Sequence, residues 1–448
     1  MKIKIKNGIV LDMVGVPERK DILIENDKII QIAKNITEEA DETIDASNRA
    51  VMPGLINCHN HVGMSIFRGY SDDLELQDWL QKAIWPVEDK LKAEDIYYSS
   101  KLGCIEMLKS GTTTFNDMYF FMEDVANAMI ETGIRGVIGR TIISNGEEAD
   151  KRIYEAKKLY EEYHNREEGR IKVNVALHAP YTCPPDVIKK GIDLAKECNV
   201  DIQIHLSETE KENEDIQKEY EKSPTQYLND LGLFSRHCVL AHGVHLSEKD
   251  LEILKDKNVG ISHNPISNLK LASGIADIVK YRKLGLTVGL GTDGSGSTNT
   301  LDMFEEMKVA SYMQKVLHKK ASCIQAKEIL EMATIEGAKV LGLEKEIGTR
   351  LFKRSNRGVS VTQEGMEFLS YARQVVEQYQ LMESRYIEKK NIKKKFGVSM
   401  QHYTFAVNAF VEMVKQFGMD EYEFAVRETK TYEVIKDVKD FHSEIGIL

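Results

Sequence analysis

The sequence lacks the cysteine patterns of a disulfide-stabilised or thiolate-ligated protein. Its six cysteines are irregularly scattered, and no two of them form a C-x-x-C pair. Because regularly spaced or paired cysteines mark disulfide frameworks and cysteine metal sites, we expect neither here. Reduced thiols in the cytoplasm are the simpler interpretation.

Long apolar segments are also missing. No uninterrupted apolar run approaches the roughly 20 residues that a helix needs to cross a bilayer. The N-terminus, MKIKIKNGIVLDM, alternates lysine with isoleucine and lacks the apolar core and small-residue cleavage site of a signal peptide. We therefore expect no membrane partner and a cytoplasmic location.

The chain has no excess of positive charge. Its 60 lysines and arginines are outnumbered by 71 aspartates and glutamates, which leaves a net charge of -11. This balance argues against broad electrostatic attraction to nucleic acid. A length of 448 residues exceeds a single small domain and leaves room for one large α/β domain with smaller companions.

Between residues 51 and 345, short apolar runs that end in polar residues alternate with longer helix-like segments. We count eight such runs: VMPGLINCHNH, TTTFNDM, RGVIGRTI, IKVNVALHAP, DIQIHLSE, HCVLAHGV, VGISHNPIS and TVGLGTDG. This alternation predicts an α/β fold, a (β/α)8 TIM-type barrel. An open doubly wound sheet is the alternative, but it would gather its chemistry at one switch point. Here His, Asp, Asn and Glu follow many different runs, which favours the barrel.

The two ends of the chain differ from this middle part. Residues 2 to 46 contain β-branched runs with turn residues at Asn7-Gly8 and Asn26-Asp27, which predicts a small β module over residues 1–50. After about residue 347 the chain becomes basic and turn-rich, then continues as one long amphipathic helix and a strand-like run at KKKFGVSM. We expect a domain boundary there.

Four residues at the ends of three runs have the chemistry of a metal site. His59 and His61 lie two apart at the end of a predicted strand, so both side chains point to one face and can share an ion. An isolated H-x-H pair is weak evidence, but His205 and Asp293 end two further runs that a barrel would bring to the same place. Three imidazoles and one carboxylate suit Zn²⁺ or Fe²⁺ and leave a position for water.

Further polar residues follow the same strands. Glu208 comes three residues after His205, where a carboxylate can exchange a proton with a bound water. A glutamate favoured by a helix N-terminus would explain Glu208 alone, but not its partnership with His205. His242 ends another run, whereas we place His245 and His263 outside the catalytic set, and His263 also fits an interior position.

At these residues the chain resembles the amidohydrolase superfamily, in particular the group that contains methylthioadenosine/S-adenosylhomocysteine deaminase, chlorohydrolases and guanine deaminase. The resemblance is collinear from residue 1 to about 345. The motifs that carry it are PGLINCHNHVGMSIFRGY, LQDWL with WPVE downstream, LHAPYTC, IHLSET, LAHGVHL, SHNPISNLKLASGIA and GTDGSGSTNTLDM.

The resemblance implies a role for each of these residues. One divalent ion, zinc in preference to iron, would be held by His59, His61, His205 and Asp293. Glu208 would transfer protons, and His242 would assist beside a metal-bound hydroxide. The substrate-binding residues would be Trp79 as the aromatic wall, Glu88 for the ribose hydroxyls, His178 for the purine, and the arginines Arg140 and Arg152, together with Glu208 and Asp293. Packing or surface charge would also account for Trp79, Glu88 and the two arginines.

The implied reaction is hydrolytic deamination of S-adenosylhomocysteine or 5'-methylthioadenosine, with adenosine as a further substrate. Hydroxide would attack C6 of the adenine, Glu208 would carry a proton to N1, and Asp293 would help to protonate the departing ammonia. The alternatives are another aminohydrolase or chlorohydrolase of the same superfamily, and an inactive hybrid chain.

From about residue 344 the chain resembles a LysR-type transcriptional regulator instead. Residues 346–392 match its wing and dimerising linker helix, and residues 393–448 match the opening of its effector-binding domain, an α+β fragment. The helices that precede the wing are absent, so sequence-specific DNA binding is not expected. The strands that normally complete the N-terminal β module are absent too. We interpret the chain as a fusion of two unrelated genes, in which the linker helix could pair two copies as a homo-oligomer.

Overall fold

We describe a computed structural model of the chain. It describes residues 1–343, apart from 14 and 27, and beyond them residues 394–400, 411–412, 414–415, 422–430, 432–434, 437 and 445–447. The predicted wing and linker helix, residues 346–392, lie outside the described residues. The chain divides into two compact units, Met1–Ala372 and Arg373–Leu448. Among the described helices, none is both long and apolar enough to cross a membrane.

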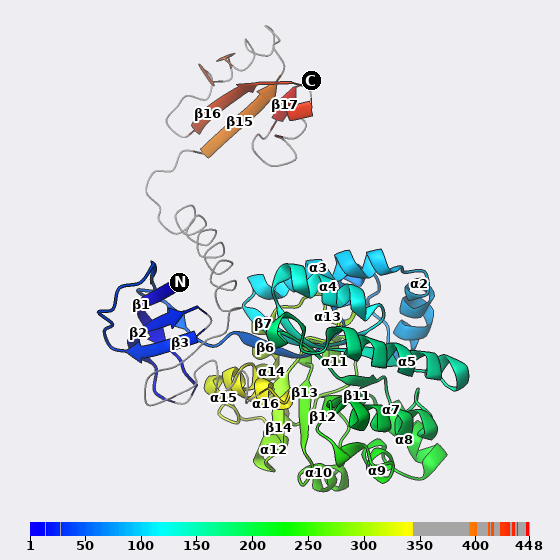
Figure 1. Cartoon of the computed structure of the whole chain (residues 1–448). Coiled ribbons are helices and arrows are strands. Elements are labelled where there is room, and N and C mark those ends of the chain that lie inside the picture. Colours follow the sequence, from blue (N-terminus) through cyan, green and yellow to red (C-terminus); the bar gives the residue numbers. More distant parts are fainter. Residues whose placement is uncertain are drawn as a thin grey trace. The chain divides into compact units, whose positions relative to one another are not determined.

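The first unit contains a nearly closed barrel of eight parallel strand positions, as the sequence predicted (Figure 1). The strands follow one another round the barrel in chain order. They are β6 (Leu55–Asn60), β7 (Thr112–Tyr119), β8 (Arg135–Ile142), β9 (Ile171–Val173) with β10 (Val175–Leu177), β11 (Ile202–Leu206), β12 (Cys238–His242), β13 (Val259–His263) and β14 (Thr287–Leu290). Each of the eight predicted runs forms one strand position. The fourth is interrupted at Asn174, where β9 pairs with β8 and β10 pairs with both β8 and β11.

Helices connect the strands and cover the outside of the barrel (Figure 1). They are η1 (Val62–Phe67), α1 (Leu76–Asp78), η2 (Trp79–Ile84), α2 (Trp85–Glu88), α3 (Ala93–Lys109), α4 (Met122–Thr132), α5 (Gly146–Tyr163), α6 (Arg166–Gly169), α7 (Pro185–Cys198), α8 (Glu210–Tyr220), α9 (Pro224–Asp230), η3 (Leu233–Ser235), α10 (Glu248–Leu254), α11 (Pro265–Lys270), α12 (Ile278–Lys283), α13 (Ser295–Thr298), α14 (Met303–Leu317), α15 (Ala326–Met332) and α16 (Ile335–Val340).

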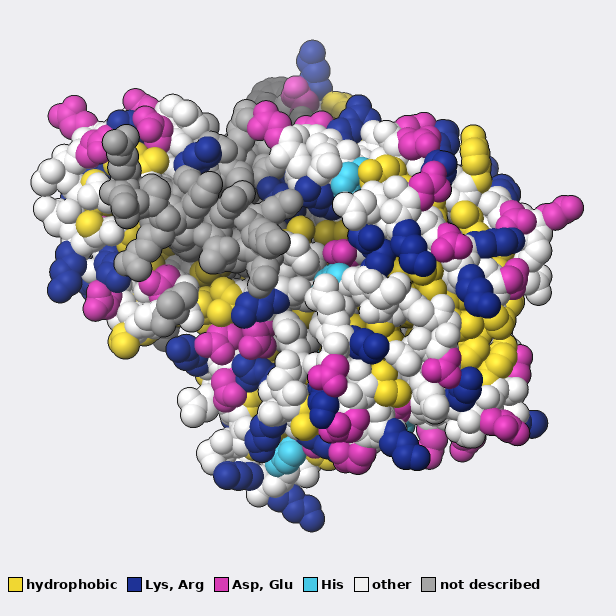
Figure 2. Space-filling view, turned by 60° about the horizontal axis from the view of Figure 1, so that its bottom comes forward, with side chains coloured by type: hydrophobic (Ala, Val, Ile, Leu, Met, Phe, Trp, Pro, Cys, Tyr) yellow, Lys and Arg dark blue, Asp and Glu magenta, His cyan; other side chains and the backbone are white. Residues whose placement is uncertain are grey.

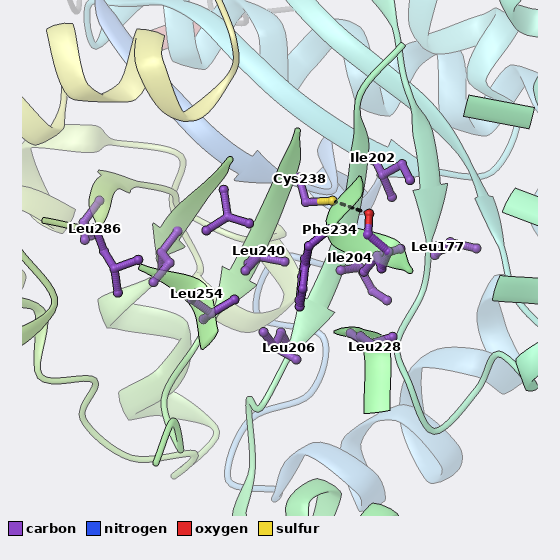
Figure 3. Close-up of a cluster of buried hydrophobic side chains, with 14 of the residues drawn as sticks. Leu177, Ile202, Ile204, Leu206, Leu228, Phe234, Cys238, Leu240, Leu254 and Leu286 are labelled. Atoms are coloured by element: carbon purple, nitrogen blue, oxygen red, sulfur yellow. Dashed lines mark hydrogen bonds between the residues drawn. The ribbon is translucent and has the colours of Figure 1, made fainter. Parts of the chain in front are cut away.

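On strand β11, polar side chains face the interior of the barrel and apolar side chains face the helices outside it. Ile202, Ile204 and Leu206 belong to a large apolar cluster that packs strands β10 to β14 against the covering helices (Figure 3). Because successive side chains of a strand point to opposite faces, Gln203 and His205 face the interior. Gln203 there accepts a hydrogen bond from Asn116 Nδ2 at 2.8 Å and donates one to Asn174 Oδ1 at 2.8 Å. The same alternation places His205 at the mouth of the barrel.

The apolar cluster outside the barrel predicts a strong effect of core truncation. Leu240 on β12 is 0% exposed within this cluster (Figure 3). Leu240→Ala is expected to lower the free energy of unfolding by about 2–5 kcal/mol, because burial is lost and a cavity remains. Urea unfolding would measure this change. Leu102→Ala, at a position that is 55% exposed, is the control and should stay within about 0.5 kcal/mol of the parent.

The barrel closes where its first strand meets its last. Asn57 on β6 donates a side-chain hydrogen bond to Thr292 Oγ1 at 2.7 Å and accepts one from the Thr292 backbone N–H at 3.0 Å. The Asp293 N–H donates to the His59 carbonyl at 3.0 Å. We call this contact between β6 and the segment after β14 the seam. It holds together residues about 235 positions apart in the chain.

A small β module precedes the barrel. Its sheet has the order β3-β2-β1-β4, with β5 also on β1, and consists of β1 (Lys2–Val10), β2 (Glu18–Glu25), β3 (Lys28–Ala33), β4 (Glu42–Asp45) and β5 (Ala50–Val51). Among the described residues, all of its strands lie within the first 51 residues. The predicted turn at Asn7-Gly8 is wrong, because these residues lie inside β1, where the register shifts between Ile5 and Gly8. Asn26, with φ of 54°, does lie between β2 and β3.

The second unit contains a parallel three-stranded sheet in the order β16-β15-β17. The strands are β15 (Lys394–Met400), β16 (Tyr422–Glu428) and β17 (Ile445–Ile447). The predicted strand-like run at KKKFGVSM coincides with β15.

Lysine and arginine side chains are interspersed with aspartate and glutamate over the face shown in Figure 2. Among the described residues on that face, both signs of charge are therefore mixed.

Candidate metal centre

Four of the residues singled out in the sequence converge at the C-terminal ends of the barrel strands. His59 lies on β6, His61 directly follows it, His205 lies on β11, and Asp293 follows β14. Asp293 Oδ1 is 3.5 Å from His59 Nε2 and 3.2 Å from His61 Nε2. His205 Nε2 is 3.3 Å from His61 Nε2. The barrel therefore brings together side chains that are up to 234 residues apart.

Hydrogen bonds at the far side of the rings aim two imidazoles inward. His61 Nδ1 lies 2.6 Å from the Met118 carbonyl, and His205 Nδ1 lies 2.6 Å from the His178 carbonyl. Such carbonyl partners fix the tautomer of a metal-binding histidine and leave Nε2 free to bind. Among the described residues the buried His59 Nε2 forms no regular hydrogen bond, and Asp293 Oδ1 lies 3.5 Å from it. A buried acceptor without a partner is costly, and this donor set fits a divalent ion.

Asp293 is held so that one carboxylate oxygen remains for the imidazoles. Its Oδ2 accepts hydrogen bonds from Ser267 Oγ at 2.6 Å and from Ser297 Oγ at 2.8 Å. Its backbone adopts a left-handed conformation, with φ of 63°. Since Oδ2 is occupied by two hydroxyls, Oδ1 is the oxygen that faces His59 and His61.

The protonation of the cluster depends on burial and on Asp293. Burial lowers the pKa of His59 to about 4 and that of His205 well below its usual value, so both are neutral and able to bind a metal. Burial would also lower the pKa of His61, but its hydrogen bond to Asp293 and the charge of that carboxylate raise it to about 9. Without an ion, His61 therefore carries a proton at neutral pH.

Binding of a divalent ion is expected to release at least one proton at neutral pH, because His61 must be neutral to act as a ligand and the ion also favours the ionised form of the nearby Glu208. The apparent affinity for Zn²⁺ should therefore rise with pH and level off above about pH 9, the pKa of His61. Calorimetric titration in two buffers of different ionisation enthalpy measures the proton release. An affinity that stays constant between about pH 7 and 9 would contradict this prediction.

Glu208 lies beside the four candidate ligands, just after β11. It is 5% exposed, and its Oε2 is 3.6 Å from His242 Nε2. Among the described residues its Oε1 forms no regular hydrogen bond, although the Ser273 hydroxyl lies close enough to lower the pKa of the carboxyl. Burial raises the pKa of its carboxyl to about 8. A carboxyl of this kind can both accept and donate a proton near neutral pH.

The backbone around Glu208 is fixed by a second buried carboxylate, Glu212 on α8. Glu212 Oε1 accepts from the Ser207 N–H and Oε2 from the Glu208 N–H, each at 2.9 Å. These bonds hold Ser207 in a left-handed conformation, with φ of 47°. Glu212 therefore sets the direction in which Glu208 leaves the strand.

His242, at the end of β12, is placed near the same centre. Its backbone is left-handed, with φ of 74°, and its Nδ1 lies 2.8 Å from Asn268 Oδ1. His59, His205 and His242 offer ring nitrogens that lie within 4.8 Å of one another. Burial lowers the pKa of His242, so its ring is neutral.

A pocket opens directly onto these residues. Trp79, Glu88 and His178, to which the resemblance assigns substrate binding, all line it. The rest of its lining is largely apolar and aromatic: Met64, Leu76, Leu80, Ile84, Trp85, Met118, Tyr119, Phe120, Thr141, Ile143 and Tyr181, together with His61, His205, Glu208, His242 and Asp293.

Each of the three expected pocket residues has an internal partner. Trp79 Nε1 donates to the Ser71 carbonyl at 3.2 Å, and Tyr119 donates its hydroxyl to Glu88. Burial raises the pKa of Glu88. His178 Nδ1 lies 2.8 Å from Thr182 Oγ1, and burial lowers its pKa to about 3, so its ring is neutral.

The two arginines lie beside the pocket rather than in its lining. Arg140 Nε pairs with Glu155 at 2.9 Å, and Arg152 Nε pairs with Glu148 at 3.0 Å. Both guanidinium groups lie over the ring of Phe120, at 5.1 and 5.8 Å from its centre. Since Phe120 lines the pocket, the arginines are one side chain away from it.

His245 and His263 take no part in the ligand cluster. His245 Nε2 lies 2.6 Å from the Ser273 carbonyl, and His263 is fully buried at the end of β13. Sequence reasoning missed Glu212, Ser267, Asn268 and Ser297, which orient the central residues. Their only sequence signal is that polar residues cluster directly after strands β11, β13 and β14.

Comparison with known proteins agrees with this geometry. Residues 50–349 match the model of the amidohydrolase family. The chain is 49% identical over 355 residues to the 5-methylthioadenosine/S-adenosylhomocysteine deaminase of Thermoanaerobacter pseudethanolicus, which covers 78% of this chain and 82% of that protein. It is 45% identical over 364 residues to the enzyme of the same name from Desulforamulus reducens, covering 80% and 84%. A zinc-bound adenosine deaminase from Xanthomonas campestris superposes with a TM-score of 0.74 at 27% identity, covering 85% of this chain and 98% of that one.

Proposed function

Since the chain belongs to the amidohydrolase family, we propose that it is a metal-dependent hydrolase that deaminates 5'-methylthioadenosine or S-adenosylhomocysteine. The products are ammonia and the corresponding inosine compound. The observation that carries this proposal is the convergence of three histidines, Asp293 and the buried Glu208 at the end of a largely apolar pocket. Relatives named for this reaction are 45% and 49% identical to the chain over the 364 and 355 residues that match.

In this proposal His59, His61, His205 and Asp293 hold one divalent ion, zinc rather than iron. Three imidazole nitrogens and one carboxylate oxygen form a ligand set that suits Zn²⁺ and leaves a further position open. A bound ion of this kind lowers the pKa of water toward about 7 and so makes a nucleophile available at neutral pH.

The side chains around the ligands carry the protons. Glu208 accepts a proton from the attacking water and delivers it to N1 of the adenine ring. His242 orients the attacking oxygen, which adds to C6 while N1 takes up the proton from Glu208. The proton that remains on this oxygen then passes through Asp293 to the amino group, the bond from C6 to the amino nitrogen breaks, and ammonia leaves.

The pocket residues bind the rest of the nucleoside. Trp79 forms an aromatic wall, His178 hydrogen-bonds the purine, and Glu88 accepts hydrogen bonds from the ribose hydroxyls. The apolar lining suits the thioether of either substrate. Arg140 and Arg152 bind the charged end of S-adenosylhomocysteine. To do so, Arg140 must release Glu155 and Arg152 must release Glu148.

Release of ammonia tests this function. The zinc-loaded chain should release one ammonia per molecule of 5'-methylthioadenosine or S-adenosylhomocysteine consumed, and removal of the ion with a chelator should stop the reaction reversibly. Turnover of adenosine, guanine and a chlorotriazine, each measured separately, distinguishes this activity from those of other enzymes in the same superfamily. A folded chain that holds one equivalent of zinc but deaminates neither thioether nucleoside would contradict the proposal.

We also propose that the chain is a fusion with the domain limits 1–50, 51–345, 346–392 and 393–448. The family match ends at residue 349, and the two relatives reported above leave 16–18% of their own length unmatched. The later segments resemble part of a LysR-type regulator, without the helices needed for sequence-specific DNA reading. A linker helix of that type would pair two chains. Light scattering tests this pairing, and a monomer at all concentrations would contradict it.

A further inference from the structure

Glu306 on α14 is a buried carboxylate that none of the roles above employs. Its side chain is 0% exposed. Oε2 accepts a hydrogen bond from the Ile266 backbone N–H at 3.1 Å, and Oε1 accepts one from Thr298 Oγ1 at 3.2 Å. Ile266 belongs to α11 and Thr298 to α13. One buried side chain thus ties two short helices together.

The two residues that Glu306 binds are direct neighbours of the two hydroxyls that hold Asp293. Ser267 follows Ile266, Ser297 precedes Thr298, and both serines donate to Asp293 Oδ2, at 2.6 and 2.8 Å. The other oxygen, Oδ1, consequently faces the imidazoles of His59 and His61. The chain of contacts runs from Glu306 through both helices to the carboxylate of Asp293.

Asn268, which follows Ser267 on α11, contacts a second residue of the site. Its Oδ1 lies 2.8 Å from His242 Nδ1. Lys270, at the end of α11, also ties the helices by donating to the Gly296 carbonyl at 3.0 Å. The Lys270 bond is partly buried, whereas the hydrogen bonds of Glu306 to α11 and α13 lie in the interior.

Packing alone does not explain an acid at this position. Burial raises the pKa of Glu306 well above its usual value, so the interior works against its charged form. An apolar residue of the same size would avoid that cost, but it would leave the Ile266 N–H and the Thr298 hydroxyl without partners. The position therefore requires two polar contacts to two different helices.

We propose that Glu306 is a positioning residue that fixes the orientation of the Asp293 carboxylate through Ser267 and Ser297. This inference rests on the proposed role of Asp293 as a metal ligand. Without Glu306 the two serines lose their common support, Asp293 can rotate, and the affinity for a divalent ion falls. Outer hydrogen-bond partners of metal ligands typically contribute about 10- to 100-fold to metal affinity, and for this more distant residue we expect about tenfold.

Zinc affinity, measured by competition with a chromophoric chelator, tests the inference without any substrate. Glu306→Leu should weaken Zn²⁺ binding about tenfold. Glu306→Gln should bind nearly as the parent does, because the amide oxygen can accept from Ile266 while the amide nitrogen donates to Thr298. The matched control is Glu305→Leu, an exposed neighbour on the same helix, which should leave the affinity unchanged.

A double-mutant cycle separates positioning from a general loss of structure. In a Ser267→Ala/Ser297→Ala background, Glu306→Leu should weaken zinc binding by less than about twofold. The two serine hydrogen bonds through which Glu306 acts on Asp293 are already absent there. A full additional tenfold loss in that background, or parental affinity in Glu306→Leu alone, would overturn the inference.

If Glu306→Leu does not fold, Thr298→Val removes only the donor to Oε1. A weaker zinc affinity in this variant supports the inference and an unchanged one overturns it. Because only Zn²⁺ is the probe, a parent chain that binds zinc but releases no ammonia would overturn the proposed substrate and leave this test valid.

Discussion

Glu208→Gln is expected to lower kcat for ammonia release about 10²- to 10⁴-fold, the usual contribution of a positioned general acid and base. The amide keeps the size of the side chain but cannot take a proton from water and return it to the ring. Burial raises the pKa of Glu208 to about 8, so its carboxyl can take up and return a proton near neutral pH.

The measurement is kcat and KM of the zinc-loaded variant with S-adenosylhomocysteine, together with its metal content. KM should change far less than kcat, since the amide keeps the size and shape of the Glu208 side chain in the pocket lining. Glu210→Gln, two residues further along and exposed, is the matched control and should behave as the parent does. A Glu208→Gln chain that contains zinc and keeps more than half of the parental kcat would refute the role of Glu208.

His205→Gln is expected to remove the metal. His205 is the only one of the four proposed ligands that β11 contributes, and its Nδ1 contact with the His178 carbonyl aims Nε2 at the other imidazoles. Loss of an outer hydrogen-bond partner costs about 10- to 100-fold in metal affinity, so the loss of a ligand should cost more than about 100-fold. Activity should fall with the metal content.

Elemental analysis after dialysis against dilute zinc measures this effect. His245→Gln provides the matched control: this half-buried histidine contacts the Ser273 carbonyl and lies outside the ligand cluster, so its variant should retain one equivalent of zinc. Equal zinc content in the two variants would mean that the ligand set is wrong.

Much of the barrel could be predicted because its strands carry local signals. Each of the eight apolar runs forms a strand position, and the polar residues that end the runs lie at one end of the barrel. The break at Asn174 and the shift inside β1 at Asn7-Gly8 escaped prediction. Both irregularities depend on how the backbone pairs with a neighbouring strand, which the local sequence does not show. A dipeptide such as Asn-Gly occurs both in a β-bulge and in a hairpin turn, so it does not distinguish the two.

The central site residues were visible for the same reason, since His59, His61, His205 and Asp293 follow strands. The residues that orient them were not. Glu305 and Glu306 are adjacent and identical in type, yet one is exposed and the other is 0% exposed. A glutamate on a helix is ordinarily expected at the surface, and only the packing of α11 and α13 against α14 shows which of the two is buried.

The seam has a consequence for the order of events in folding. His59 and Asp293 lie on opposite sides of it and are joined by the bond between the Asp293 N–H and the His59 carbonyl. A growing chain cannot assemble the metal-binding set until Asp293 has been made and the first strand has met the last. An ion that binds only the closed barrel stabilises it by mass action, in proportion to the logarithm of its free concentration. Zinc uptake by the nascent chain would thus report completion of the barrel, and starvation for the metal would favour the open form.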